Sequence, residues 1–270
     1  MKLSYNSNGY VKYSIEKTIE SLGRLGYEGI EIARTHPVHE LSKQKRKKLL
    51  EMIKSHGLQV SAVQGGTPCL DVEFAKARID LAVDLECPIV NLGPGLDVVE
   101  EKKRGKYWKE VVEGFKKLAT YAKNKGITVV MEAEPPTNVV SGRVGRVHPR
   151  LIATLADMKR MLADVRAENF AILLDIGHMY CVKENVLNVI EQLSEKIVHV
   201  HIEDIVDRIH CHFIPGTGMV DFEGTVKTLD KVGYKGFLSV ELEAHMEEPE
   251  KAALETIQYF DSLLDKTGLE

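Results

Sequence analysis

Four short segments of the chain each run from apolar residues into a side chain that can bind a metal ion. They span residues 127–132, 171–175, 197–201 and 237–241, and their last residues are Glu132, Asp175, His201 and Glu241. Spacings of 43, 26 and 40 residues between these ends leave room for one crossover helix each time. If the segments are neighbouring parallel strands, three carboxylates and an imidazole meet at one rim. That set predicts a site for a divalent cation.

Alternation along each strand leaves a second candidate beside three of these ends. Side chains two residues apart point to the same face of a strand, so the alternatives are Glu134, His199 and Glu243. One member of each pair is then the ligand, and the other lies on the rim. Asp175 is the least ambiguous candidate because it ends an otherwise apolar strand, where a buried carboxylate must be paired or bound to a metal.

The elements that must position these residues alternate along the whole chain. Short runs of Val, Ile and Leu predict buried strands at 2–6, 28–33, 58–64, 88–92, 127–133, 170–175, 196–201 and 236–242. Amphipathic stretches predict helices at 14–25, 42–55, 72–86, 107–125, 155–166, 184–194, 222–232 and 249–266. Strict alternation predicts an α/β fold, a (β/α)8 TIM barrel that forms a single domain over residues 1–270. An open doubly wound sheet is disfavoured, because Gly216-Thr217-Gly218 lacks the third glycine of a phosphate-binding turn.

The overall composition argues against partners of two kinds. The 270 residues carry 36 basic and 40 acidic side chains, and this net charge of −4 gives no sign of a surface for nucleic acid or for a membrane. No apolar run approaches the roughly 18 residues of a membrane-spanning helix. The four cysteines form no CxxC pair, so a reducing compartment, the cytoplasm, is the expected location.

Several motifs resemble those of the xylose-isomerase-like TIM-barrel superfamily. Besides segment 127–132, they are Asp175-Ile176-Gly177-His178, His201-Ile202-Glu203-Asp204, Pro215-Gly216-Thr217-Gly218 with Asp221-Phe222, and Leu238-Ser239-Val240-Glu241. The superfamily includes sugar-phosphate isomerases and epimerases, ketose 3-epimerases, hydroxypyruvate isomerases, inosose and dehydroshikimate dehydratases, and AP endonucleases of family 2. The resemblance spans essentially the whole chain and is specific for the superfamily rather than for one activity. It implies that the four strand-end residues bind a metal and that His178 contacts the substrate.

The chain departs from two branches of this superfamily. Ketose 3-epimerases carry an arginine six residues after the histidine of the seventh strand, where this chain has Asp207, with Arg208 one residue later. The element His210-Cys211-His212 resembles the Asp-x-His zinc element of the AP endonucleases. That branch also has histidines after its early strands, and segments 64–66 and 91–93 contain none. A three-metal hydrolase site is therefore incomplete.

The expected function is that of a metal-dependent sugar or keto-polyol isomerase or epimerase. The ligand set suits one divalent cation, Mn²⁺ first, with Mg²⁺, Co²⁺ or Zn²⁺ as alternatives. The cation would polarise a carbonyl and an adjacent hydroxyl of a small substrate, while Glu132 and Glu241 exchange a proton with its two faces. One alternative is a dehydratase with His210 or His212 as the acid, and an AP-endonuclease-like hydrolase is a further one. A homo-oligomer is an open possibility.

The loop at 202–220 is expected to select the substrate. Its side chains Arg208, His210 and His212 would close over the far end of the bound molecule. The Pro-Gly and Gly-x-Gly steps at 215–218 suit a tight turn that folds the segment back over the rim. The alternative is a surface loop whose histidines are solvated.

Overall fold

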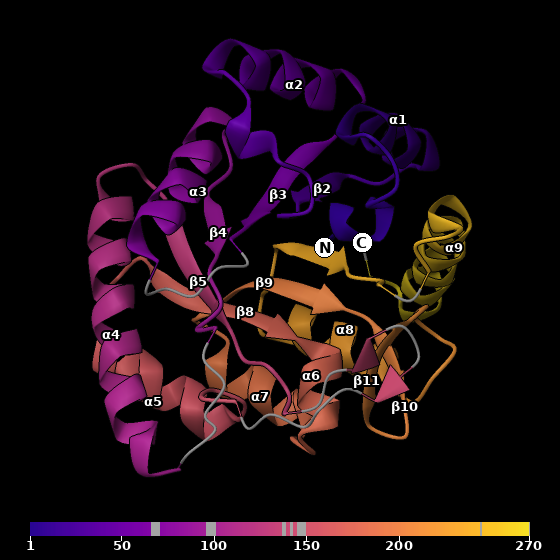
Figure 1. Ribbon diagram of the computed structural model, residues 1–270. Coiled ribbons are helices and arrows are strands. Elements are labelled where there is room, and N and C mark those ends of the chain that lie inside the picture. The colour runs from indigo at the N-terminus through magenta and orange to yellow at the C-terminus, as the bar shows by residue number, and fades with distance from the viewer. Residues whose placement is uncertain are drawn as a thin grey trace.

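Eight parallel strands close into a barrel that helices surround (Figure 1). The computed structural model describes residues 1–65, 71–95, 101–136, 139–140, 143–144, 150–243 and 245–269. The barrel strands are β1 (Lys2–Asn6), β2 (Gly29–Ile32), β3 (Gln59–Gln64), β4 (Ile89–Asn91), β5 (Thr128–Glu132), β8 (Phe170–Asp175), β9 (Ile197–Ile202) and β12 (Phe237–Val240). Strand β1 pairs with both β2 and β12, which closes the ring. The predicted (β/α)8 TIM barrel is therefore confirmed.

Helices follow the strands and lie outside them. They are α1 (Ile15–Leu25), α2 (Lys43–Ser55), α3 (Val72–Asp84), α4 (Glu101–Lys123), α5 (Leu155–Val165), α6 (Ile176–Cys181), α7 (Val186–Leu193), α8 (Phe222–Lys231) and α9 (Pro249–Thr267). Short 3-10 helices cover Ser7–Tyr10 and Val38–Glu40, and small strand pairs are β6 (Val139–Val140) with β7 (Arg143–Val144) and β10 (Asp204–Val206) with β11 (Ile209–Phe213). Within the described residues, no helix is both long and apolar enough to cross a membrane.

Side-chain caps fix where several helices begin. The Oγ or Oδ atoms of Ser42, Asp71, Thr154 and Asp221 each accept a hydrogen bond from the backbone N–H three residues later. These bonds satisfy donors that the first helical turn leaves without an intrahelical partner. The helices therefore begin directly after the loops that leave the carboxyl ends of the strands, and those ends are free to carry functional side chains.

An apolar cluster lies in the lower part of the barrel, and the metal-binding candidates lie at its carboxyl end. Val130, Ala171 and Leu173 form a small buried cluster inside the ring, apart from the larger core between strands and helices. Glu132 and Asp175 are the next inward positions on the same strands, because side chains alternate along a strand. In β5 and β8 the last residue therefore lies at the carboxyl end of the barrel, directly above the apolar inward residues of the same strand.

Three local features differ from the sequence prediction. Helix α4 begins at Glu101 rather than at residue 107. The short helix α6 follows β8 directly, since the Asp175 side chain caps it by accepting a bond of 2.8 Å from the His178 N–H. Strands β10 and β11 form a hairpin inside the segment expected to be a loop, and the hairpin packs against α6 (Figure 1). Its two turn residues, Asp207 and Arg208, have φ values of 53° and 60°, a left-handed turn built without the usual glycine.

Candidate metal centre

The four predicted strand-end residues meet at the carboxyl end of the barrel. One oxygen or nitrogen atom from each of Glu132, Asp175, His201 and Glu241 lies within 4.8 Å of all the others. The Nδ1 atom of His201 is 3.4 Å from Glu132 Oε1, 3.8 Å from Asp175 Oδ2 and 3.3 Å from Glu241 Oε2. All four side chains are buried. We call these four residues the quartet.

The quartet fits a divalent cation. Within the described residues, the buried atoms Asp175 Oδ2 and His201 Nδ1 have no hydrogen-bond partner, although both face the other ligand atoms. Adjacent ligands of a six-coordinate ion with bonds of about 2.1 Å lie about 3 Å apart, close to the separations from His201 Nδ1. Three carboxylate oxygens with one imidazole nitrogen suit hard or borderline cations, and the set contains no thiolate of the kind found in most structural zinc sites.

Three amide side chains hold the two glutamates of the quartet. Asn6 and Gln64 donate to Oε1 of Glu241 at 3.0 and 3.2 Å, and Asn91 donates to Oε2 of Glu132 at 2.8 Å. Each glutamate therefore keeps one oxygen turned toward His201 and the other fixed by an amide. These amides were not predicted from the sequence, although each is the last residue of its strand, as Glu132 and Asp175 of the quartet are.

The two glutamates differ in how readily they ionise. Burial alone would raise the pKa of Glu132, but the charges of His201 and His178 and the hydrogen bond from Asn91 lower it to about 2. Burial raises the pKa of Glu241, and His201 offsets only part of that effect. One carboxyl of the pair thus favours its ionised form more strongly than the other, which is the asymmetry that proton transfer between two faces of a substrate requires.

Cation binding is expected to weaken as the pH falls. Burial and the charge of Glu203 raise the pKa of Asp175 well above its usual range. Burial alone would lower the pKa of His201, but the charges of Glu31 and Glu241 raise it well above its usual range. A cation must displace the protons that these groups hold, so the apparent Mn²⁺ affinity should rise with pH, up to about tenfold per pH unit for each proton released. Calorimetry in buffers of different ionisation enthalpy counts these protons, and a pH-independent affinity would contradict the expectation.

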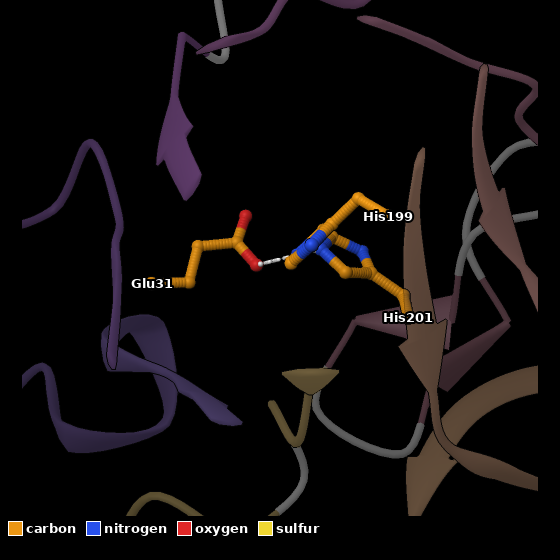
Figure 2. A group of neighbouring side chains, drawn as sticks. All are labelled: Glu31, His199 and His201. Atoms are coloured by element: carbon orange, nitrogen blue, oxygen red, sulfur yellow. Dashed lines mark hydrogen bonds and ion pairs between the residues drawn. The ribbon is translucent and has the colours of Figure 1, made fainter. Parts of the chain in front are cut away.

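The three alternating alternatives lie outside the quartet. Glu134 pairs with Arg150 at 3.2 Å, and Glu243 accepts a hydrogen bond from Asn8. Both glutamates line a cleft of about 490 Å³ that also reaches Glu132. The third alternative, His199, is buried one step deeper in the barrel, where its Nε2 lies 3.0 Å from Glu31 Oε2 (Figure 2). The cleft therefore meets the quartet at Glu132.

A second buried cluster joins His178 with residues of the β10–β11 segment. The Nδ1 atom of His178 donates to the Ala133 carbonyl at 2.8 Å, so its Nε2 presents a lone pair. That Nε2 lies 3.1 Å from His210 Nε2, which is 3.0 Å from Glu203 Oε1. The Nδ1 of His212 is 3.0 Å from the other Glu203 oxygen and donates to the Glu241 carbonyl at 2.9 Å. His178, His210 and His212, which the sequence predicted to contact the substrate, thus lie together around the Glu203 carboxylate.

Glu203 is the member of this cluster that the sequence analysis did not single out. It is fully buried, and its contacts with the two histidines lack the geometry of hydrogen bonds. Burial alone would raise the pKa of Glu203, but the charges of His212 and His210 hold it well below its usual range. A side chain at Gly177 would collide with this carboxylate, which explains the glycine beside His178. The cluster can hold a polar group of a ligand or, through His178, Glu203 and His210, a cation.

Arg208 lies apart from these histidines. It is exposed at the hairpin turn, and its Nη1 donates to the Tyr180 carbonyl at 2.9 Å. The segment after the hairpin folds back as predicted, since the Thr217 N–H bonds to the Ile214 carbonyl and Gly216 between them has a φ of 90°. Asp204, which the sequence analysis did not assign, fastens this turn.

The Asp204 carboxylate accepts four backbone hydrogen bonds. Its Oδ2 receives the N–H groups of Gly216 and Gly218 at 2.9 and 2.8 Å, and its Oδ1 receives those of Ile205 and Val220 at 2.9 and 3.1 Å. One buried carboxylate at the start of β10 therefore binds both the start of the hairpin segment and the turn that follows it. This arrangement fixes the position of His210 and His212.

Comparisons with known proteins agree with the barrel fold. The family model described as a xylose isomerase-like TIM barrel matches residues 19–263. The fructoselysine 3-epimerase of Shigella flexneri is 24% identical over 285 residues, with 98% of each chain covered. The inosose dehydratase of Clostridium perfringens is 30% identical over 177 residues, 59% of this chain and 52% of that protein. A structure of the IOLI protein with a zinc atom shares the fold, with a TM-score of 0.81 at 19% identity and 99% of both chains covered.

Proposed function

The chain belongs to the xylose isomerase-like TIM barrel family, and we propose that it is a metal-dependent isomerase or epimerase of a sugar or keto-polyol. The observation that carries this proposal is the quartet, three buried carboxylates and a buried imidazole, with Glu132 lining a cleft of about 490 Å³. The similarity to a fructoselysine 3-epimerase along the whole chain supports it. The proposed partner is a small molecule, with no role for nucleic acid or a membrane.

The proposed ligands of the cation are Glu132, Asp175, His201 and Glu241. Mn²⁺ is the first choice for this set, and Mg²⁺, Co²⁺ and Zn²⁺ are the alternatives. The zinc atom in the IOLI structure supports a divalent ion in a barrel of this shape. When bound, the cation would polarise a carbonyl and an adjacent hydroxyl of the substrate, which makes the neighbouring C–H group more acidic.

Glu132 and Glu241 are the proposed acid and base. Their pKa values are lowered and raised respectively, so Glu132 starts as the base and Glu241 as the acid in one direction of the reaction. Glu132 removes the carbon-bound proton on one face of the substrate, and Glu241 returns a proton to the other face. The amide groups of Asn6, Gln64 and Asn91 keep both carboxyls in place during the transfer.

A dehydratase is the second candidate, and one observation favours it. Burial alone would lower the pKa of His212, but the charge of Glu203 raises it well above its usual range, so a protonated imidazole lies beside the quartet. Such a group can protonate a departing hydroxyl after the same initial proton abstraction. The partial similarity to an inosose dehydratase supports this candidate too. An AP-endonuclease-like hydrolase is less supported, because segment 91–93 and residues 64–65 contain no histidine.

We also propose that His178 hydrogen-bonds a substrate oxygen and that Arg208, His210 and His212 bind the part of the substrate far from the reacting carbon. The proposed location is the cytoplasm, which the free thiols of Cys87, Cys181 and Cys211 support.

Product analysis in D₂O separates the candidate functions. The protein is incubated with a panel of ketoses, their phosphates and an inosose, and products are followed by NMR while elemental analysis counts bound metal. An epimerase or isomerase yields a rearranged sugar with deuterium at the reacting carbon and about one divalent ion per chain. A dehydrated product identifies a lyase, and two or three zinc ions with phosphodiester cleavage identify a hydrolase. The absence of both a bound divalent ion and a product from every sugar would overturn the proposal.

The hairpin residues are expected to set substrate selectivity without holding the metal. His212→Ala removes the partner of a buried carboxylate, and Arg208→Ala removes the bond to the Tyr180 carbonyl. Each should raise KM or lower kcat by about 10-fold or more, with metal content unchanged, and change the rate ratio between two competing sugars. Lys235→Ala, an exposed cation before β12 at the opposite end of the barrel, is the control. Unchanged kinetics and selectivity in both hairpin variants would leave the loop without this role.

A further inference from the structure

A buried glutamate lies inside the barrel directly below the quartet. Glu31 is on β2, is fully buried and reaches across the barrel interior to His199 and His201 on β9 (Figure 2). Its Oε2 atom is 2.9 Å from His201 Nε2 and 3.0 Å from His199 Nε2, and it accepts a bond of 2.8 Å from Ser239 Oγ. Three donors from two strands therefore converge on one carboxylate oxygen that no step of the proposed reaction uses.

The contact with Glu31 decides which nitrogen of His201 faces the quartet. An ionised carboxylate oxygen only accepts hydrogen bonds, so the Nε2 of His201 must carry the hydrogen. In the neutral ring the lone pair then lies on Nδ1, and Nδ1 is the atom that faces Glu132, Asp175 and Glu241. A carboxylate that receives the second N–H of a metal-binding histidine fixes both its tautomer and its ring orientation.

A cation held by Glu31, His199 and His201 is the competing interpretation, because their atoms also lie close enough together. The distances of 2.9 and 3.0 Å are those of N–H···O hydrogen bonds. A cation there, together with one at the quartet, would require His201 to bind metal through both nitrogens as an imidazolate. Ser239 also donates to the same oxygen, so that oxygen already has three donors.

We propose that Glu31 is a positioning residue of the metal centre, which holds the His201 ring so that Nδ1 points at the cation. His199 and Ser239 in turn hold the carboxylate of Glu31. The inference rests on the proposed function only in placing a cation at the quartet. It concerns binding of that cation and makes no demand on the identity of the sugar.

The test measures cation affinity without any sugar. Glu31→Gln keeps the size of the side chain and removes the carboxylate. Competition with a chelator should show that this variant binds Mn²⁺ about 10–100-fold more weakly than the parent chain. Glu28→Gln is the matched control, since it makes the same charge change at an exposed position three residues earlier and should bind Mn²⁺ as the parent does. An unaltered Mn²⁺ affinity in Glu31→Gln would overturn the proposal.

A second measurement needs no variant and stays decisive if Glu31→Gln fails to fold. The ring nitrogens of His201 are followed by ¹⁵N NMR in the parent protein loaded with diamagnetic Zn²⁺. A proton on Nε2 and none on Nδ1 is the expected state, and a proton on Nδ1 would overturn the proposal. A change in stability alone, seen as a shift in the unfolding midpoint, would change neither the Mn²⁺ affinity of the folded protein nor the nitrogen of His201 that carries the proton. The protein could lack isomerase activity and still show both the weaker Mn²⁺ binding of Glu31→Gln and the proton on Nε2 of His201. That outcome would contradict the proposed function and support the role of Glu31.

Discussion

Replacing Asp175 with asparagine is expected to remove the bound cation and to abolish turnover. Its Oδ2 atom has no hydrogen-bond partner within the described residues and faces the quartet, where an amide would present N–H groups or a weaker neutral oxygen. The fold should survive, because Oδ1 caps α6 through the His178 N–H and asparagine caps helices as well as aspartate does. His201→Ala should lose the cation too. Elemental analysis after dialysis, alongside turnover at saturating substrate, measures both effects.

A matched control separates the metal from the cap. Asp221 also caps a helix, α8, but it lies at an exposed position. Asp221→Asn should therefore retain the full amount of cation and normal turnover. If Asp175→Asn or His201→Ala keeps one cation per chain with normal turnover, the centre has been assigned to the wrong residues.

The quartet could be predicted because each of its members is visible in a local pattern. An apolar run that ends in Glu132, Asp175 or His201 indicates both the strand and the functional end of that strand, and parallel strands bring those ends together without further information. The choice between residues two positions apart was harder, because both point to the same face. The structure separates them by depth: His201 faces the quartet, whereas His199 lies one step lower beside Glu31.

The supporting residues could not be predicted in the same way. Glu31 lies in the middle of a four-residue strand, and its partner His201 is 170 residues away across the closed barrel. Asn6 and Asn91 end their strands, but an amide at a strand end has no chemistry of its own until the register brings it against a carboxylate. Such roles depend on which strands face each other across the barrel, and these contacts are known only once the closed barrel and its register are known.

The β10–β11 hairpin could not be predicted for a different reason. Its turn residues Asp207 and Arg208 both adopt left-handed backbone conformations, which the usual Asn-Gly or Gly-Gly signature would have indicated. Without that signature, 204–213 was expected to be an irregular loop. The tight turn after it was visible because proline followed by glycine favours one turn type. Asp204 belongs to the motif His201-Ile202-Glu203-Asp204, but nothing in the sequence indicates the four backbone N–H groups whose bonds it accepts.

Glu132→Gln and Glu241→Gln are each expected to lower kcat by about 10²–10⁴-fold, or about 3–5 kcal/mol of activation free energy. Each substitution keeps the shape of the side chain and removes the group that takes or gives the proton. Both residues are also proposed ligands, so the rates are measured at saturating Mn²⁺, where a weaker affinity for the cation does not limit turnover. Glu195→Gln, at an exposed position before β9, should behave as the parent chain does.

Isotope exchange distinguishes the loss of proton transfer from a general loss of activity. With Glu132 as the base in one direction, Glu132→Gln should stop the exchange of the substrate's carbon-bound hydrogen with D₂O when that substrate is supplied. Glu241→Gln should still allow exchange from that substrate, while net conversion falls, because its base remains and only the proton donor on the other face is lost. Supplying the product instead should reverse the two patterns. Undiminished exchange in both variants, from either side of the reaction, would remove both carboxyls as the acid and base, and the proton would then have to move through the cluster of His178, Glu203 and His210.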